Sequence, residues 1–375
     1  MLSDEMIYAA GEIFFERMHR IVLRYLKLMG AHLRDIGRIS ATDAYRVAQM
    51  RRVAVTQGQI VREVAREAQQ SVSDVHAVLE ASARSDAQSY SAWALPAQAA
   101  QEMMAQLVAE QFQVTAGRMV NLANTTVVSE AYVRAVDVAV QSVRSGVTDY
   151  QASVRDVLRE AAEAGLRVRD GTDTPVVAYE KGGTRRLDSA ARQNVLDGVR
   201  DLSNASSERL GEAFGADGVE ISAHMDCATD HLPWQGLQMS RKDFDAIQAE
   251  LPRPYRMWNC RHHIYPIVLG VSKPAHTDEE LKQMRERSQE QIEIDGRTKS
   301  RYAWTQEQRR IETRIRALKD MAVAAKAAED MPLRRECQRG INDLTAYYER
   351  MSEAAGLPTR EKRMSVGGFR AVKAE

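Results

Sequence analysis

Apolar side chains recur at intervals of three and four through the first 165 residues, which is the repeat of helices that each bury one face. The repeat is unbroken over 6–29, after which Gly30 offers a stop. A second helix is predicted to open near Ser40 or Thr42, and a third after Gly58. Because such helices are stable mainly through packing on partners, this region must form a helical assembly.

Three more helices are expected before residue 165. Pro96 suits the first turn of one that runs to about Met119. The polar run NLANTT at 121–126 predicts a break, and further helices are expected over 129–144 and 149–163. No segment of this region alternates polar and apolar residues as a strand does. The N-terminal region is therefore expected to be all-helical.

Short β-rich runs alternate with helical ones after residue 165. Ser240 and Asp243 stand in capping-box spacing, which predicts the start of a short helix. The elements expected in this part are a β-rich run at 174–179 with a hairpin turn at 181–184, a helix over 188–214, a strand at 219–222, the helix after Ser240, and a strand over 263–270.

Helices return after Pro274. Thr277 is a predicted cap, and TQEQ at 305–308 has the capping-box spacing that opens a long helix. Pro332 marks a junction before a helix over 333–354. The last twenty residues are basic and contain glycine, so we expect a tail.

A chain of 375 residues exceeds what one hydrophobic core usually supports, so more than one domain is expected. The predicted fold is mainly α with a small α+β module: long amphipathic N-terminal helices, a central mixed segment with short strands, and a C-terminal helical hairpin. The predicted divisions are an all-helical docking region at 1–165, the α+β module at 166–273, C-terminal helices at 274–355 and a basic tail at 356–375.

The charges balance, with 52 lysines and arginines against 52 aspartates and glutamates, so no overall field draws the chain to nucleic acid or to a membrane. Three widely spaced cysteines make no disulfide framework. No apolar run reaches the roughly 20 residues that span a bilayer, and the N-terminus lacks the order of a secretory signal. We expect a soluble, non-secreted protein without membrane contact.

The sequence lacks the usual catalytic motifs. It has no GKS or GKT phosphate loop, no G-x-G-x-x-G after a strand, no G-x-S-x-G elbow and no H-E-x-x-H. A nucleotide-driven motor or an ordinary hydrolase is therefore unsupported, and an enzyme is the less favoured class.

Histidine and cysteine gather in two short segments, HMDCATDH and NCRHH, separated by about thirty residues. Two ligand pairs joined by a connecting segment are how zinc sites are commonly built, because thiolate and imidazole are the preferred donors of Zn²⁺. The candidate ligands are His224, Cys227, His231, Cys260, His262 and His263.

The same residues have two other interpretations. The histidines could hydrogen-bond backbone carbonyls at strand ends while Cys260 packs as a small apolar residue. Alternatively, three ligands and an open position would permit hydrolysis, with Asp226 or Asp230 as the base. Four protein ligands would instead make a closed, structural site.

A basic run over 297–319 could contact phosphates through counterion release. Acidic residues stand among the basic ones at helical spacing, which favours a solvated, salt-bridged helix face instead. Both interpretations place the run on the surface. The candidate phosphate contacts are Arg309, Arg310, Arg314, Arg316 and Lys319.

The segments SAHMDCATDHLPWQG and YRMWNCRHHIYPIVLGVS resemble the core signature of the tailed-phage minor capsid protein 2 family, and flanking segments extend the resemblance over nearly the whole chain. The chain departs from the pattern at Ala228 and Thr229, where the family more often has arginine and proline, and neither Cys227 nor His263 belongs to it. The matching positions are Ser222, His224, His231, Trp234, Gln235, Gly236, Asn259, Cys260, Arg261, His262 and Pro266.

The resemblance reduces the ligand set to His224, His231, Cys260 and His262, with Cys227 optional. It implies a structural, low-copy component of the virion head near the portal vertex, made in the host cytoplasm and involved in head assembly or in DNA packaging and delivery. The implied partners are portal or major capsid subunits in an oligomeric particle, docked on 1–165. The alternatives are a metal-dependent hydrolase or effector carried in the virion, and an internal head protein that contacts packaged DNA.

Overall fold

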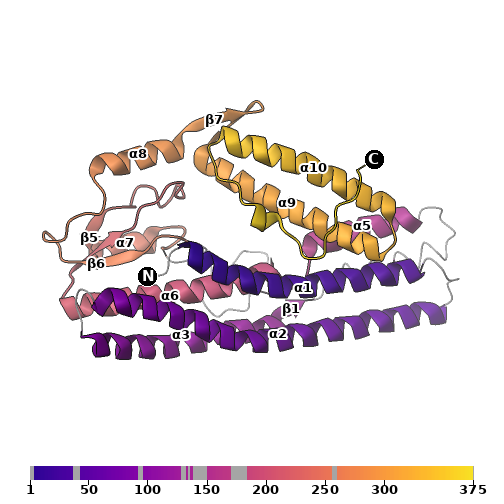
Figure 1. Cartoon of the computed structure of the whole chain (residues 1–375), viewed down its shortest axis with the longest axis horizontal. Coiled ribbons are helices and arrows are strands. Elements are labelled where there is room, and N and C mark those ends of the chain that lie inside the picture. Colours follow the sequence, from indigo (N-terminus) through magenta and orange to yellow (C-terminus); the bar gives the residue numbers. More distant parts are fainter. Residues whose placement is uncertain are drawn as a thin grey trace.

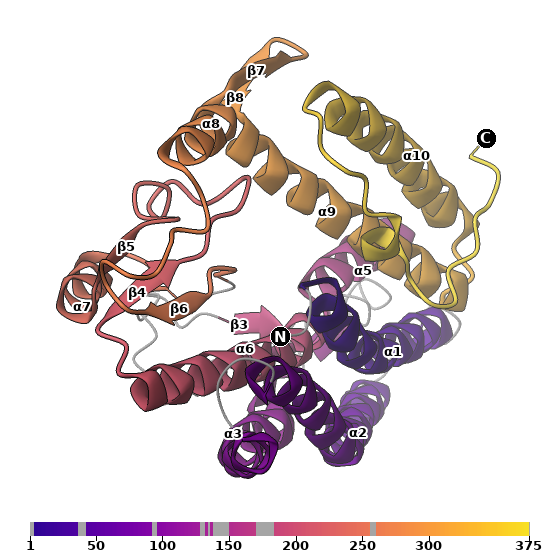
Figure 2. The same cartoon turned by 60° about the vertical axis from the view of Figure 1, so that its left-hand side comes forward.

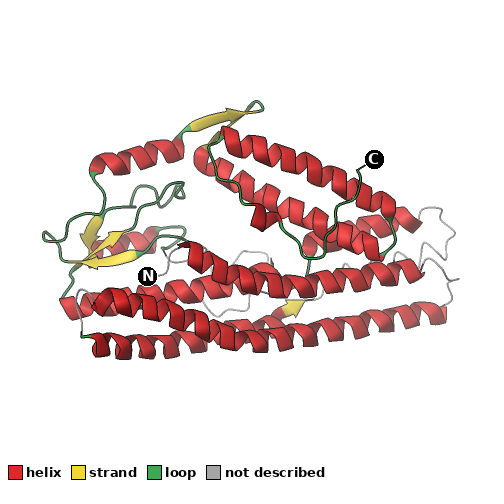
Figure 3. Ribbon diagram, viewed as in Figure 1, coloured by secondary structure: helices red, strands yellow, loops and turns green. Residues whose placement is uncertain are grey.

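The computed structural model is mainly helical, with small antiparallel sheets (Figures 1 and 3). Its helices lie in three tiers: α2 and α3 in the lowest, α1 and α6 in the middle, α9 and α10 in the highest (Figure 1). The fold class expected from the sequence is thus confirmed. The structure describes residues 4–36, 43–91, 96–127, 132–133, 136–137, 150–169, 184–255 and 260–374.

The first helix, α1 (Asp4–Ile36), passes through Gly30, so the predicted stop there is wrong. A Cβ atom on Gly30 would lie 2.5 Å from the carbonyl oxygen of Ala324 in α9 (Arg301–Ala327). The glycine therefore permits a close approach of two helix backbones, and packing compensates its cost of about 1 kcal/mol within a helix.

The second and third predicted helices are one, α2 (Asp43–Ser91), which runs through Gly58. The predicted break at 121–126 is also wrong, because α3 (Ala97–Thr125) continues to Thr125 with Pro96 as its N-cap. The hydroxyl of Thr125 donates to the carbonyl oxygen of Asn121 at 2.9 Å. Polar residues that bond back to the preceding turn can thus remain helical where their composition suggests a loop.

A short strand, β1 (Thr126–Val127), follows α3 and pairs with β2 (Arg167–Arg169), which in turn pairs with β3 (Thr184–Arg186). The expectation of no strand before residue 165 is therefore wrong. Helix α5 (Tyr150–Ala164) confirms the one predicted over 149–163. The β-rich run and turn at 174–184 and most of the helix predicted over 129–144 lie outside the described residues.

The central elements follow the prediction closely. Helix α6 (Leu187–Phe214) ends at Gly215 in the left-handed conformation, and α7 (Arg241–Glu250) is capped by Ser240. A sheet of order β5-β4-β6 stands beside the C-terminal end of α6 (Figure 2). Its antiparallel strands are β4 (Gly218–Ile221), β5 (Gln238–Ser240) and β6 (Ile264–Ile267), of which β5 was not predicted.

The C-terminal part begins with α8 (Asp278–Gln289), whose capping box from Thr277 confirms the prediction. A hairpin of β7 (Gln291–Ile294) and β8 (Arg297–Ser300), missed from the sequence, then leads into α9. Ser300 caps α9, so the helix begins one turn before the predicted start at 305.

The last helix, α10 (Met331–Ala354), pairs with α9 as the expected hairpin. The basic segment after it forms a 3-10 turn at Glu361–Met364 and folds back over this pair. Its apolar side chains Leu357, Met364 and Val366 are buried.

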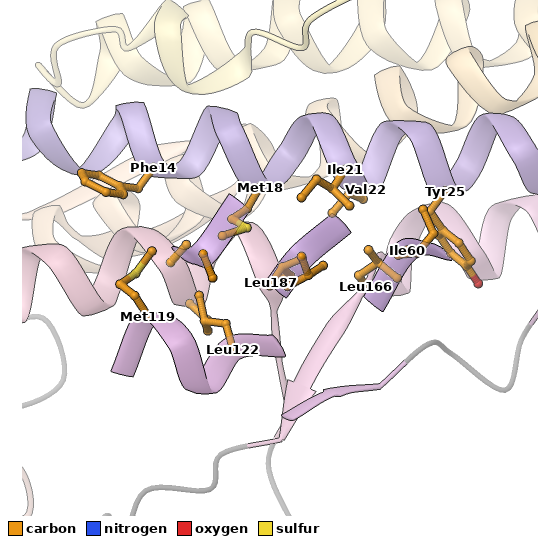
Figure 4. Close-up of a cluster of buried hydrophobic side chains, with 14 of the residues drawn as sticks. Phe14, Met18, Ile21, Val22, Tyr25, Ile60, Met119, Leu122, Leu166 and Leu187 are labelled. Atoms are coloured by element: carbon orange, nitrogen blue, oxygen red, sulfur yellow. The ribbon is translucent and has the colours of Figure 1, made fainter. Parts of the chain in front are cut away.

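The main hydrophobic core draws side chains from α1, α2, α3, α5, α6, α9 and α10. Figure 4 shows its centre, where Met18 of α1 lies above Leu122 of α3, and Val22 of α1 lies above Leu187 of α6. A buried polar cluster of His19, Arg186, Asp188 and Asp320 lies within the same assembly. Among the described helices, none is long and apolar enough to cross a membrane.

Candidate metal centre

The His/Cys cluster lies where β4 ends and β6 begins. Ser222, just after β4, donates from its backbone nitrogen to the carbonyl oxygen of His263 at 2.9 Å. The backbone nitrogen of His263 donates to the Ser222 hydroxyl at 2.9 Å. This reciprocal pair holds the two segments side by side, so the ligands predicted from separate parts of the sequence meet.

The structure brings together five of the six candidate ligands. They form two groups, each with its donor atoms within 4.8 Å of one another, and these groups could hold a metal ion. In the described part of the chain, His263 belongs to neither group, and its ring neighbours Tyr265. The groups are His224, Cys227 and His262, and His231, Cys260 and His262.

Two imidazoles are oriented by backbone carbonyls. The Nδ1 atom of His224 lies 2.9 Å from the carbonyl oxygen of Met225, and Nε2 of His231 lies 2.6 Å from that of Arg253. A carbonyl only accepts, so each of these nitrogens carries the hydrogen. The other ring nitrogens, Nε2 of His224 and Nδ1 of His231, are then the ones with a lone pair for a metal.

His262 lies between the two thiols. Its Nε2 atom is 3.4 Å from Sγ of Cys227, and its Nδ1 atom is 3.4 Å from Sγ of Cys260. Burial, with the neighbouring rings of His224 and His231, lowers the pKa of His262 to about 2. The ring is therefore neutral in solution, which is the form that binds metal ions.

Cys227 is fully buried and completes the first group. Burial, with Cys260 and Asp230 nearby, raises the pKa of its thiol to about 12. Without a cation the thiol keeps its proton, and a bound metal would release it. The donor set of imidazole and thiol suits Zn²⁺. Cys227 does not belong to the family pattern, yet its sulfur is as close to the ring of His262 as the sulfur of Cys260 is.

Apolar side chains pack against one side of the cluster. Val219, Ile221, Phe244, Tyr255 and Ile264 form a small core that Cys260 contacts. The ring of Tyr255 stacks on His231 with centroids 4.2 Å apart, and its hydroxyl donates to the backbone oxygen of His231 at 3.3 Å. Packing of this kind fixes the orientation of the ligands.

The two carboxylates considered as catalytic bases are both ion-paired. Asp226 accepts from Nε of Arg301 at 2.9 Å, and Asp230 accepts from Nε of Arg253 at 2.8 Å. Although burial raises it, the hydrogen bond from Arg253 lowers the pKa of Asp230. Because an arginine engages each carboxylate, neither is free to activate water, which favours a structural site over a hydrolytic one.

The other signature residues brace the cluster. The backbone nitrogen of His224 donates to the Gln235 side chain at 3.1 Å, and Gly236 adopts a φ of +76° that a side chain would strain. Trp234 packs on the small core, and Pro266 lies against Gly211 of α6. Asn259 lies outside the described residues.

The basic run is less exposed than predicted. Arg310 and Arg314 are exposed, but the guanidinium of Arg316 lies over the Phe15 ring, and Nζ of Lys319 donates to the Met364 carbonyl oxygen at 2.7 Å. Arg316 and Lys319 are half-buried, because α1 and the C-terminal segment cover part of that face of α9. Arg309 is half-buried beside the His/Cys cluster.

Sequence reasoning missed the contact that Arg261 makes and the position of Arg360 near the cluster. Arg261 donates from Nε to the hydroxyl of Tyr8 in α1 at 3.0 Å, which ties the signature segment to the N-terminal helix. Arg360, from beyond α10, lines the same cavity as Arg261. No pattern indicates such contacts, since the partners are far apart in sequence.

The family model described as Phage minor capsid protein 2 matches residues 15–351, which contain both His/Cys segments and all the long helices at least in part. The comparisons with curated proteins and with solved structures gave no match.

Proposed function

Because the chain belongs to the Phage minor capsid protein 2 family, we propose that it is a structural component of a tailed-phage head that sits at the portal vertex. There it supports head assembly or the packaging and delivery of DNA, with portal or major capsid subunits as partners. The observation that carries a structural role is the ion pairing of Asp226 and Asp230, because it leaves neither of these two described carboxylates free to act as a base for the His/Cys cluster.

In this proposal the cluster holds one Zn²⁺ that staples the α+β module. The ligands are drawn from His224, His231, Cys260 and His262, and Cys227 is a further candidate. Zinc would cross-link the segment that follows β4 to the segment that precedes β6. Each of these two strands has only four residues, so the cross-link would stabilise a small sheet.

The docking surface is proposed to lie on α2 and α3. A groove of about 360 Å³ runs between these helices and is lined by small and apolar residues such as Ala83, Met104, Ala105 and Val108. An amphipathic helix of a partner subunit could place its apolar face in such a groove.

Binding of the full-length protein to purified portal tests this assignment. Ala105 and Ala109 are exposed residues of the groove, so Glu at either position adds bulk and charge without disturbing the core. We expect Ala105→Glu to weaken portal binding at least ~10-fold. The matched control is Ala246→Glu on the exposed face of α7, which should bind as the unmodified protein does. Equal binding by all three proteins would reject the groove as the docking surface.

A further inference from the structure

A cavity of about 270 Å³ separates the His/Cys cluster from the N-terminal half of α9. Three arginines from distant parts of the chain line it: Arg261 from the signature segment, Arg309 from α9 and Arg360 from the segment after α10. The family signature and the basic helix thus face the same space.

The carboxylates near this cavity form ion pairs with other arginines. Asp226 is bound to Arg301, and the other lining arginine, Arg253, is bound to Asp230. Glu312 is buried and lies 3.6 Å from Arg363. Among the described residues, these acids are thus already paired with other arginines.

Within the described chain, Arg261, Arg309 and Arg360 take part in no ion pair. The Nε atom of Arg309 and an Nη atom of Arg360 are shielded from solvent without a hydrogen-bond acceptor. Burial, with Arg261 and Arg363 nearby, lowers the pKa of Arg309 to about 10. Buried donors without acceptors are costly, and an oxyanion would satisfy them with charge-assisted hydrogen bonds.

We propose that this cavity binds a phosphate group through Arg261, Arg309 and Arg360. The planar guanidinium presents paired donors that match phosphate oxygens. The volume lies just below the usual range of small-molecule pockets, so the cavity suits a phosphate with a small substituent and excludes a duplex. The site does not depend on the proposed position at the portal vertex.

A second, more open hollow of about 590 Å³ shares Gln306 and Arg309 with the cavity and continues along α9 past Arg310 and Arg314. Further phosphates joined to the first could follow this path. The phosphate can therefore come from a small molecule or from the end of a single DNA strand, and these sources share the same recognition chemistry.

Calorimetric titration of the full chain with inorganic phosphate, at constant ionic strength, tests the site. We expect one saturable site per chain, and we expect Arg309→Gln to weaken it at least ~10-fold. Arg310→Gln is the matched control, because Arg310 lies on the same helix but lines only the open hollow, and its variant should change the affinity less than ~2-fold. Arg360→Gln replaces Arg309→Gln if the latter does not fold, and should show the same loss.

No saturable binding to the unmodified chain, or an equal loss in the Arg309→Gln and Arg310→Gln variants, would overturn the proposal. Zinc content is measured for each variant, so that loss of a metal is not mistaken for loss of the anion site. A single-stranded oligonucleotide with a 5′-phosphate then competes with inorganic phosphate if DNA is the source. Failure to compete assigns the site to a small phosphate, and either result supports the site itself.

Discussion

His19 of α1 and Asp320 of α9 form a buried ion pair, with Nε2 of the imidazole 3.1 Å from Oδ1 of the carboxylate. The Nδ1 atom of the same ring lies 2.9 Å from Asp188 of α6, and Arg186 contacts both carboxylates at 3.0 Å. Two cations and two anions thus join three helices that are far apart in sequence. Such a cluster is stable only if each charge keeps its partner.

The pH dependence of stability should reveal this cluster. Burial alone would lower the pKa of His19, but the carboxylates of Asp188 and Asp320 raise it to about 9 from an ordinary 6.5. The proton is therefore held more tightly in the folded state. Its contribution, roughly 3 kcal/mol, is complete below pH 6.5 and is lost as the pH rises through 9. Urea denaturation at several pH values measures this loss.

His19→Gln should flatten the dependence between pH 6.5 and 9 and destabilise the protein by about 3 kcal/mol, because Asp188 and Asp320 each lose one of their two cationic partners. His76→Gln is the control, since the His76 side chain is 43% exposed, its ion pair is with Glu80 on its own helix, and its ring contacts only the edge or face of Phe112 among the described aromatic rings. A slope that is unchanged in the His19 variant would contradict the role assigned to this imidazole.

Alanine at two helical glycines should act in opposite directions. Gly30→Ala places a methyl group 2.5 Å from the Ala324 carbonyl oxygen, so we expect a loss of about 1–3 kcal/mol. At Gly58 the added atom would meet only Arg62, at 3.4 Å, and the better helix propensity of alanine should stabilise the protein by roughly 0.5–1 kcal/mol. Thermal denaturation compares the two, and a stabilising Gly30→Ala would refute the close approach of α1 and α9.

Single cysteine substitutions should distinguish a cysteine that binds metal from a cysteine that only packs in the core. Cys260→Ser is expected to abolish any increase in melting temperature on adding zinc, because a serine hydroxyl is a poor zinc ligand. Cys337→Ser should lower the melting temperature itself, since Cys337 is buried in the main core, yet keep the zinc response. The same zinc response in both variants would remove Cys260 from the site. Cys227→Ser shows whether this buried thiol is also a ligand.

Local patterns explain which elements the sequence predicts. Ser240 with Asp243, and Thr277 with Glu280, are caps made by residues three apart, and both were found where expected. The meeting of the two His/Cys segments also followed from the sequence, because dense clusters of donors rarely occur without a common site.

Contacts between distant segments explain the rest. From the sequence, Gly30 was interpreted as a helix end. Its role is to allow the close approach of Ala324, and this could not be predicted because Ala324 is almost three hundred positions away. The arginine-lined cavity could not be predicted either, since Arg261 and Arg360 come together only in the folded chain. Tertiary packing overrode local propensity at each of these positions.

Native mass spectrometry of the full chain, with and without a chelator, tests the zinc-stapled module most directly. We predict one zinc ion per chain in the untreated protein, and a shift to the charge states of an unfolded module when the ion is removed. A protein that carries no metal and keeps the same charge states in chelator would contradict it, and would make the cluster a hydrogen-bonded scaffold.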